Sequence, residues 1–168
     1  MPDSPTSTAP PSPAPPHPLV DPVALEAIYA HARQEYPKEC CGIVFGPRDR
    51  PVADRAHRCE NIQDRLHAED PQRFSRDART AYTFEARDIF TLQKSLRGDQ
   101  PAKLVYHSHA DVGAYFSDTD QAAASFDGEP AYPVEYLVVD VRADGTRGSK
   151  QFAWHAEHRS YVEIGSYP

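Results

Sequence analysis

The stretch Val105-Tyr106-His107-Ser108-His109 begins as a buried strand and ends in two histidines. Successive side chains of a strand point to opposite faces of the sheet, so residues two apart share a face. We therefore expect His107 and His109 to point to the same side and their imidazole rings to converge. The sheet and a reactive site are predicted to meet at this strand.

Ser117 follows His109 after seven residues, and Asp120 follows Ser117 after two more. Asp120 stands at the start of the next element, where its carboxylate can supply a third, hard ligand. Three protein ligands and one open position are typical of catalytic zinc, whereas structural zinc takes four ligands, often cysteines. The sequence thus predicts a Zn²⁺ site held by His107, His109 and Asp120. The same ligands also suit non-haem iron, for which no cosubstrate-binding residues are evident.

Each of these residues also has an ordinary structural explanation. Ser117 can be the N-cap of a helix that includes 121–126, with Asp120 in the first turn, where the helix dipole favours a carboxylate. A partly exposed edge strand with alternating polar residues would also show a His-x-His pattern. The start of a helix holds the side chains of Ser117 and Asp120 in fixed positions, so capping and catalysis do not exclude each other.

The full spacing resembles that of the JAMM, or MPN-plus, zinc metalloproteases. Their pattern is an upstream Glu, then His-[Ser/Thr]-His, seven residues, Ser, two residues and Asp. The chain matches this pattern from His107 to Asp120 without a gap. Pro37-Lys38-Glu39-Cys40-Cys41-Gly42 resembles the glutamate-bearing turn of the compact bacterial members, so Glu39 is the matching position. The resemblance covers about 22–155, and Ala110 replaces the usual Pro, from which we expect a looser loop and unchanged chemistry.

The resemblance implies hydrolysis of a peptide or isopeptide bond. Zinc would lower the pKa of a water to about 7 and so supply the nucleophile. Glu39, beside the metal, would take the proton of that water and return it to the leaving amine. Ser117 would donate a hydrogen bond to the oxyanion. Without the motif, Glu39 would be a solvated carboxylate just before a strand.

The resemblance further implies an α+β fold of the JAMM/MPN, cytidine-deaminase-like type, with a curved, mainly antiparallel sheet flanked by helices. Compact bacterial members process the Gly-Gly ends of ubiquitin-like proteins, including sulfur carriers from which a C-terminal cysteine or short extension is removed. A ubiquitin-like or sulfur-carrier protein is therefore the expected partner. Two alternatives stay open: a small-molecule amide or cysteine-conjugate metallohydrolase, and a non-catalytic MPN-like scaffold.

The composition indicates one domain with a tail. Residues 1–20 are mostly Pro, Ser, Thr and Ala, which bury too little surface to order a chain, so we expect a disordered tail followed by a single domain at 21–168. The tail does not resemble a signal peptide, and no segment is expected to span a membrane. The net charge of −7, without basic runs between aromatics, argues against a nucleic-acid partner.

The cysteines, the arginines and the other histidines have ordinary structural interpretations. Cys40, Cys41 and Cys59 do not have zinc-ribbon spacing; they indicate a reducing cytoplasm and buried small side chains. The arginines between Arg48 and Arg97 favour a salt-bridged surface over a carboxylate-recognition patch. Surface positions are expected for the other histidines: His17, His31, His57, His67, His155 and His158.

The apolar pattern predicts the elements around the motif. A helix should begin at Pro22 and end before Pro37, and a second should span 85–96. Strands are expected at 42–46, 52–59, 81–84, 134–141 and 149–154, and the last two should lie beside the histidine strand. The polar connection 61–79 is either a flap over the cleft or an ordinary surface loop.

Overall fold

The computed structural model describes residues 13–168. Residues 1–12, which make up most of the predicted tail, lie outside the described part. The elements in chain order are β1 (Leu19–Val20), α1 (Pro22–Glu35), β2 (Cys41–Phe45), β3 (Val52–Ala53), β4 (Arg55–Cys59), α2 (Gln63–Glu69), α3 (Ala86–Ser95), β5 (Ala102–Ala110), α4 (Asp118–Ala124), β6 (Ser125–Phe126), β7 (Glu129–Pro130), β8 (Glu135–Arg142), β9 (Gly145–His155) and β10 (Ser160–Tyr167). None of the helices in this range is long and apolar enough to cross a bilayer.

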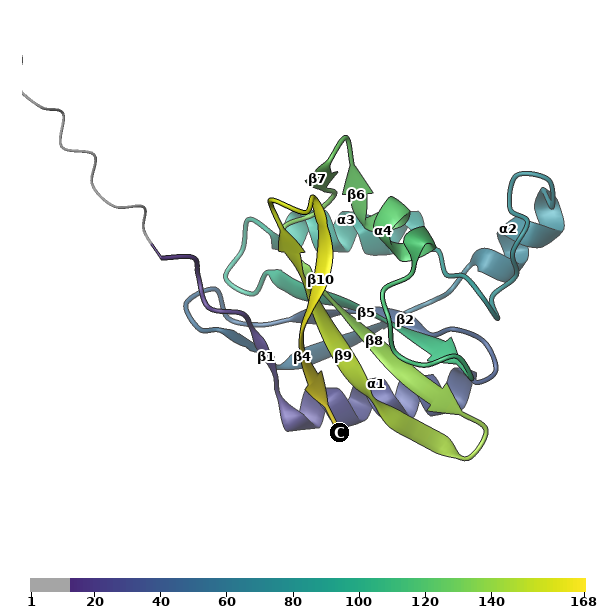
Figure 1. Cartoon of the computed structure of the whole chain (residues 1–168), viewed down its shortest axis with the longest axis horizontal. Coiled ribbons are helices and arrows are strands. Elements are labelled where there is room, and N and C mark those ends of the chain that lie inside the picture. Colours follow the sequence, from purple (N-terminus) through teal and green to yellow (C-terminus); the bar gives the residue numbers. More distant parts are fainter. Residues whose placement is uncertain (1–12) are drawn as a thin grey trace, which may run out of the picture.

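Six strands form the central sheet in the order β10-β9-β8-β5-β2-β4 (Figure 1). The pair β5 and β8 is parallel, and the other neighbours are antiparallel. The predicted mixed α+β fold with a mainly antiparallel sheet is therefore confirmed. The histidine strand β5 lies inside the sheet between β2 and β8. Strand β8 lies beside it as expected, whereas β9 pairs with the far side of β8 and does not touch β5 in the strand order.

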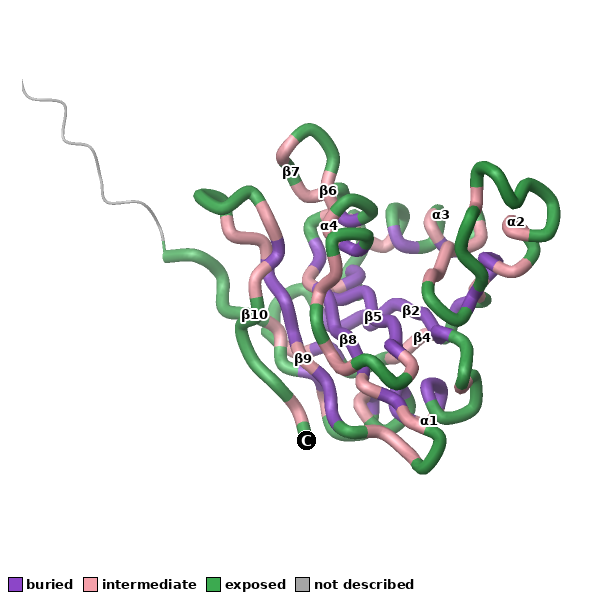
Figure 2. Tube along the Cα trace, turned by 45° about the vertical axis from the view of Figure 1, so that its right-hand side comes forward, coloured by how far each residue is buried: buried purple, intermediate pink, exposed green. Residues whose placement is uncertain are grey.

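Different helices pack on the two faces of the sheet. On one face α1 packs through Ala24, Ile28 and Ala32 against side chains that include Leu104 and Tyr106 of β5. On the other face Val105 of β5 belongs to a second buried cluster, together with residues of α3 and α4. Figure 2 shows that burial is concentrated in the central strands. The alternation along β5 thus directs its histidines to the face of α3 and α4.

Helix α1 begins and ends as the sequence predicts. Asp21 is its N-cap and accepts a hydrogen bond from the backbone N–H of Val23, and Pro22 occupies the first turn. The helix ends at Glu35, two residues before Pro37.

Gly42 of β2 must lack a side chain, since a Cβ there would lie 2.3 Å from the Tyr106 ring.

Four local predictions differ from the structure. The strand expected at 52–59 is divided at Asp54 into β3 and β4, which belong to different sheets. The strand expected at 81–84 is wrong: the segment makes only one isolated bridge, between Asn61 and Phe84. The connection 61–79 contains helix α2, whose N-cap Ile62 provides no side-chain hydrogen bond and hence no start signal. Helix α4 stops at Ala124, because Ser125–Phe126 pairs with Glu129–Pro130 as β6 and β7. The sequence pattern also missed β10.

The predicted tail joins the domain at β1, which forms a separate two-stranded sheet with β3. Leu19 and Val20, the last two residues of the predicted tail, pair in parallel with Val52 and Ala53 of β3. Val20 is buried in the α1 cluster. The described end of the tail is thereby fixed to the domain at this point.

Protonation of His31 should destabilise the protein in mild acid. His31 is a buried residue of α1, and its Nδ1 forms a 2.8 Å hydrogen bond with the Tyr106 hydroxyl. Burial, assisted by Arg58, lowers the pKa of His31 to about 4. Between pH 6.5 and 4 the unfolded chain therefore holds the extra proton, and the stabilisation is lost as the pH falls through this window. The loss amounts to at most about 3 kcal/mol.

Denaturant unfolding of wild type and His31→Gln at pH 7 and pH 4.5 measures this effect. The Gln variant keeps a polar partner for Tyr106 but does not titrate, so its stability should fall less between the two pH values. Equal losses in both proteins would show that His31 does not contribute.

Candidate metal centre

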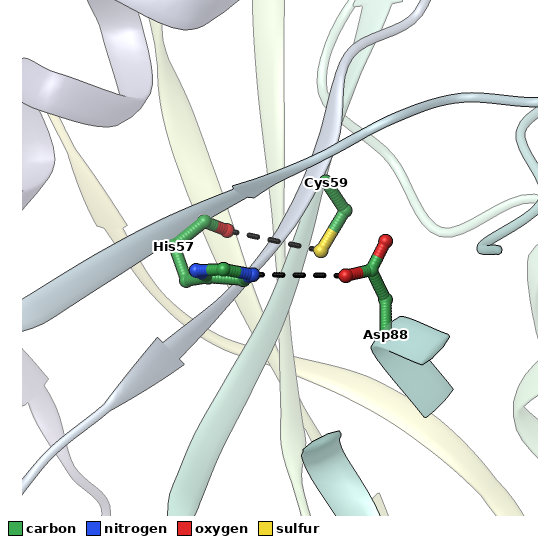
Figure 3. A group of neighbouring side chains, drawn as sticks. All are labelled: His57, Cys59 and Asp88. Atoms are coloured by element: carbon green, nitrogen blue, oxygen red, sulfur yellow. Dashed lines mark hydrogen bonds and ion pairs between the residues drawn. The ribbon is translucent and has the colours of Figure 1, made fainter. Parts of the chain in front are cut away.

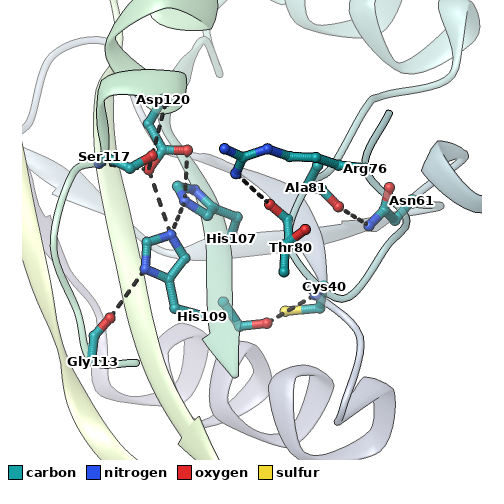
Figure 4. A network of polar contacts seen from close by, with 11 residues as sticks. Cys40, Asn61, Arg76, Thr80, Ala81, His107, His109, Gly113, Ser117 and Asp120 are labelled. Atoms are coloured by element: carbon teal, nitrogen blue, oxygen red, sulfur yellow. Dashed lines mark hydrogen bonds and ion pairs between the residues drawn. The ribbon is translucent and has the colours of Figure 1, made fainter. Parts of the chain in front are cut away.

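His107, His109 and Asp120 converge in the structure, as the sequence predicts (Figure 4). The two Nε2 atoms lie 3.2 Å apart. Asp120 Oδ1 lies 3.2 Å from His107 Nε2, and Asp120 Oδ2 lies 3.5 Å from His109 Nε2. All three residues are buried. Strand β5 presents both rings on one face, and the first turn of α4 brings the carboxylate to them.

The donor set fits a metal ion. His109 Nδ1 lies 3.1 Å from the Gly113 carbonyl, which can only accept, so this nitrogen carries the proton and Nε2 of the neutral ring carries a lone pair. That lone pair faces another imidazole nitrogen and a carboxylate, an arrangement that a cation would stabilise. Ligand atoms around a tetrahedral metal with bonds of about 2.0–2.1 Å lie roughly 3.3–3.4 Å apart. The three separations observed here are close to that value.

The charge states also suit metal binding. Burial raises the pKa of Asp120, but His107 and His109 lower it by more, so the net pKa lies well below the usual range. Burial lowers the pKa of His107, only partly opposed by Asp120. Asp120 is thus ionised and His107 neutral, the forms in which these groups bind metals.

Ser117 stands at the N-cap of α4, in agreement with its structural interpretation. Its Oγ accepts a hydrogen bond from the Asp120 backbone N–H at 3.1 Å and donates one to Asp120 Oδ2 at 2.8 Å. Ser117 N also donates to Oδ2, at 2.9 Å. This capping box fixes the carboxylate and leaves Oδ1 directed at His107.

Glu39 lies at the entry of β2 and is only 6% exposed. It lines the same cleft as His109, Ser117 and Asp120. Burial, followed by the negative charge of Asp120, raises the pKa of Glu39 to about 8, while Arg76 acts in the opposite direction. Glu39 is therefore the second carboxyl group of the site and, unlike Asp120, it is not among the clustered ligand atoms.

Two residues that the sequence analysis did not single out fix the position of Glu39. Ser108 points to the face opposite the histidines, and its Oγ accepts a 2.9 Å hydrogen bond from the backbone N–H of Cys40. The side-chain amide of Asn61 donates to the carbonyls of Glu39 and Ala81, both at 3.0 Å. The His-Ser-His spacing contained the signal for Ser108, whereas nothing in the sequence pointed to Asn61.

Replacing Ser108 by Ala should destabilise the domain by about 1–3 kcal/mol, because the Cys40 N–H would remain buried without its partner. Ser108→Thr retains the hydroxyl and is the matched control. Denaturant unfolding of both variants measures the difference. A Ser108→Ala protein as stable as the Thr variant would contradict the role assigned to this hydrogen bond.

The segment 61–79 returns to the centre at its C-terminal end. The Glu39 backbone N–H donates to the Ala78 carbonyl at 2.7 Å, and Asp64 Oδ1 accepts from Ala78 N. Arg76 and Arg79 consequently line the cleft beside Glu39. This end of the segment therefore forms one wall of the cleft, as a flap would.

The remaining histidines lie elsewhere. His155 and His158 stack on each other with ring centroids 4.1 Å apart, and within 13–168 they join no group of three potential ligands. His31 is buried rather than at the surface, because it lies on the side of α1 that packs against Tyr106 of the sheet. His57 belongs to a separate cluster with Cys59 and Asp88.

The sequence of this chain is similar to those of known proteins. A family model described as prokaryotic homologs of the JAB domain matches residues 21–156. Proteins named CysO-cysteine peptidase from Mycobacterium tuberculosis and Mycobacterium bovis are 27% identical over 119 residues, which cover 70% of this chain and 69% of theirs.

Solved structures share the fold. A protein from Desulfitobacterium hafniense superposes with a TM-score of 0.58 at 21% identity, over 86% of this chain and 88% of the other. A JAB1/MPN domain protein from Archaeoglobus fulgidus superposes with a TM-score of 0.51 at 13% identity, over 89% and 94%.

Proposed function

The chain belongs to the prokaryotic JAB-domain family, and from this membership and the metal centre we propose that it is a zinc-dependent peptidase. The observation that carries the proposal is the convergence of His107, His109 and Asp120 at a cleft that Glu39 also lines. Zinc suits two imidazoles and a carboxylate with one position left open. In such a site zinc supplies a water of pKa about 7 and polarises a carbonyl.

Glu39 is the proposed proton carrier. In the metal-free state its pKa is raised to about 8 by burial and by Asp120. Positive charge at the three ligands would offset Asp120 and lower the pKa of Glu39 toward neutrality, the range that suits a general base. Glu39 would accept the proton of the attacking water and deliver it to the amine as the C–N bond breaks.

Ser117 is the proposed donor to the carbonyl oxygen as that oxygen gains negative charge. Its hydroxyl proton is directed at Asp120 Oδ2 in the structure, so the hydroxyl must turn toward the cleft to act. The backbone N–H of Ser117 also donates to Oδ2 and can hold the carboxylate during this turn. Loss of such a donor reduces kcat by about 10²–10³.

We propose the C-terminal Gly-Gly end of a ubiquitin-like or sulfur-carrier protein as the substrate. The mycobacterial relatives named CysO-cysteine peptidase support this class. If a single residue is released, its free carboxylate must be accommodated beyond the scissile bond. Arg76 and Arg79 in the cleft wall supply the matching positive charge.

Replacing Arg79 by Gln should raise KM roughly tenfold for a substrate that ends in a free carboxylate, because a charge-assisted contact is lost. The same substrate with an amidated C-terminus should be insensitive to the change. Arg73→Gln is the matched control, since Arg73 is exposed on the same segment and does not line the cleft. Equal effects of Arg79→Gln on acid and amide substrates would contradict carboxylate recognition.

A comparison of substrates tests the proposed function against its alternatives. We expect rapid release of a short extension after Gly-Gly from a ubiquitin-like protein and slow turnover of a free dipeptide. Equal turnover of the dipeptide would favour a small-molecule metallohydrolase. Cellular function that survives Glu39→Gln would favour a scaffold.

A further inference from the structure

His57, Cys59 and Asp88 form a second group of potential metal ligands (Figure 3). Their ligand atoms all lie within 4.8 Å of one another. His57 Nε2 lies 3.7 Å from Asp88 Oδ1. Cys59 and Asp88 are each 6% exposed, whereas His57 is half-buried. An imidazole, a thiol and a carboxylate thus meet at the edge strand β4.

The group is built in the same way as the first centre. In both, two residues separated by one position on a strand point to the same face: His107 and His109 on β5, His57 and Cys59 on β4. In both, the carboxylate comes from the third residue of a helix, Asp120 in α4 and Asp88 in α3. The same combination of strand and helix start therefore occurs twice on one sheet.

Asp88 provides independent evidence for a ligand. Its Oδ2 is buried without any hydrogen-bond partner; in the described part of the chain, His107 Nδ1 is the other such side-chain atom. Figure 3 shows the Asp88 carboxylate facing the His57 ring and the Cys59 sulfur. A buried carboxylate oxygen without a partner is costly, and a cation is a common way to compensate it.

We propose that His57, Cys59 and Asp88 bind a divalent transition-metal ion of the zinc type, separate from the ion of the peptidase centre. Mixed nitrogen, sulfur and oxygen ligands suit Zn²⁺ and its substitute Co²⁺, and disfavour Mg²⁺ and Ca²⁺, which prefer oxygen. The exposed side of His57 leaves room for water as a further ligand.

The position of the site indicates a structural effect. Cys41 of β2 pairs with Cys59 on one side and with His107 on the other. The two centres therefore lie two strands apart, about 10 Å, on one face of the sheet. A metal bound to β4 and α3 would fasten the sheet edge to the helix, next to the strand whose entry carries Glu39.

Cobalt binding to reduced, metal-free protein distinguishes the two centres. The first centre contains no cysteine, so a near-ultraviolet thiolate-to-cobalt charge-transfer band reports the second centre alone. We expect wild type to bind two equivalents of Co²⁺ and to show this band. Asp120→Ala should lose one equivalent and keep the band, whereas Asp88→Asn and Cys59→Ser should lose one equivalent and the band.

Cys41→Ser is the matched control, because Cys41 is a buried thiol directly opposite Cys59. It should keep both equivalents and the band. If Cys59→Ser does not fold, His57→Asn at the half-exposed position serves instead and should weaken the second equivalent about tenfold or more. A single equivalent without a thiolate band in wild type, a band that survives Cys59→Ser, or an unchanged affinity for the second equivalent in His57→Asn would overturn the proposal.

Discussion

Glu39→Gln is expected to lower kcat by about 10²–10⁴-fold while the protein keeps its zinc. Gln has the size of Glu but cannot carry the proton from water to the leaving amine. The buried carboxyl group lies outside the cluster of ligand atoms, so its loss should not empty the metal site. Steady-state kinetics on a tailed ubiquitin-like protein, together with elemental analysis of the same sample, measures both effects.

Glu35→Gln is the matched control for this variant. Glu35 is an exposed acid four residues earlier, at the end of α1, and its neutralisation should leave kcat unchanged. A zinc-free Glu39→Gln protein would show that Glu39 is itself a metal ligand. An active, zinc-loaded variant would show that another group moves the proton.

Asp120→Ala is expected to remove zinc and activity together. The change deletes the ionised carboxylate of the ligand set and leaves two imidazoles whose Nε2 atoms lie 3.2 Å apart. Removal of a group that only orients a metal ligand lowers metal affinity by about 10–100-fold. Removal of a ligand itself should cost more, so we expect zinc affinity to fall by more than about 100-fold. Isothermal titration of metal-free protein with zinc measures this loss.

The capping role of Asp120 must be separated from its role as a ligand. Asp120→Asn keeps an oxygen that can accept the Ser117 backbone N–H, so the start of α4 should persist while zinc affinity still falls. Asp118→Asn, an exposed carboxylate in the same turn, should retain wild-type zinc affinity. Equal zinc binding by wild type and Asp120→Ala would exclude Asp120 as a ligand.

The convergence of the site residues was predictable because each lies at a position that local rules determine. Alternation along β5 directs His107 and His109 to one face, and the capping box places Asp120 in the first turn of α4. Glu39 was identified through the resemblance of its turn to that of the JAMM family. Their chemical roles remain predictions that the variants above test.

Other features depend on contacts between distant segments. Asn61 and Arg76 reach the centre because the segment around α2 folds back on the entry of β2. His57 and Asp88 share no recognisable spacing, and only the packing of α3 on β4 brings them together. The segment 81–84 resembles a strand, yet it finds no neighbouring strand to pair with beyond a single bridge.

Metal content and cleavage measured on one purified sample test the central claim most directly. Elemental analysis would be combined with mass spectrometry of a ubiquitin-like protein that carries a short extension after Gly-Gly, with and without a chelator. We predict that wild type contains zinc that Asp120→Ala lacks, that it removes the extension at the Gly-Gly end, and that chelation stops cleavage until zinc is restored. Cleavage at an undiminished rate by zinc-free protein, or wild type with no more zinc than Asp120→Ala, would contradict the account.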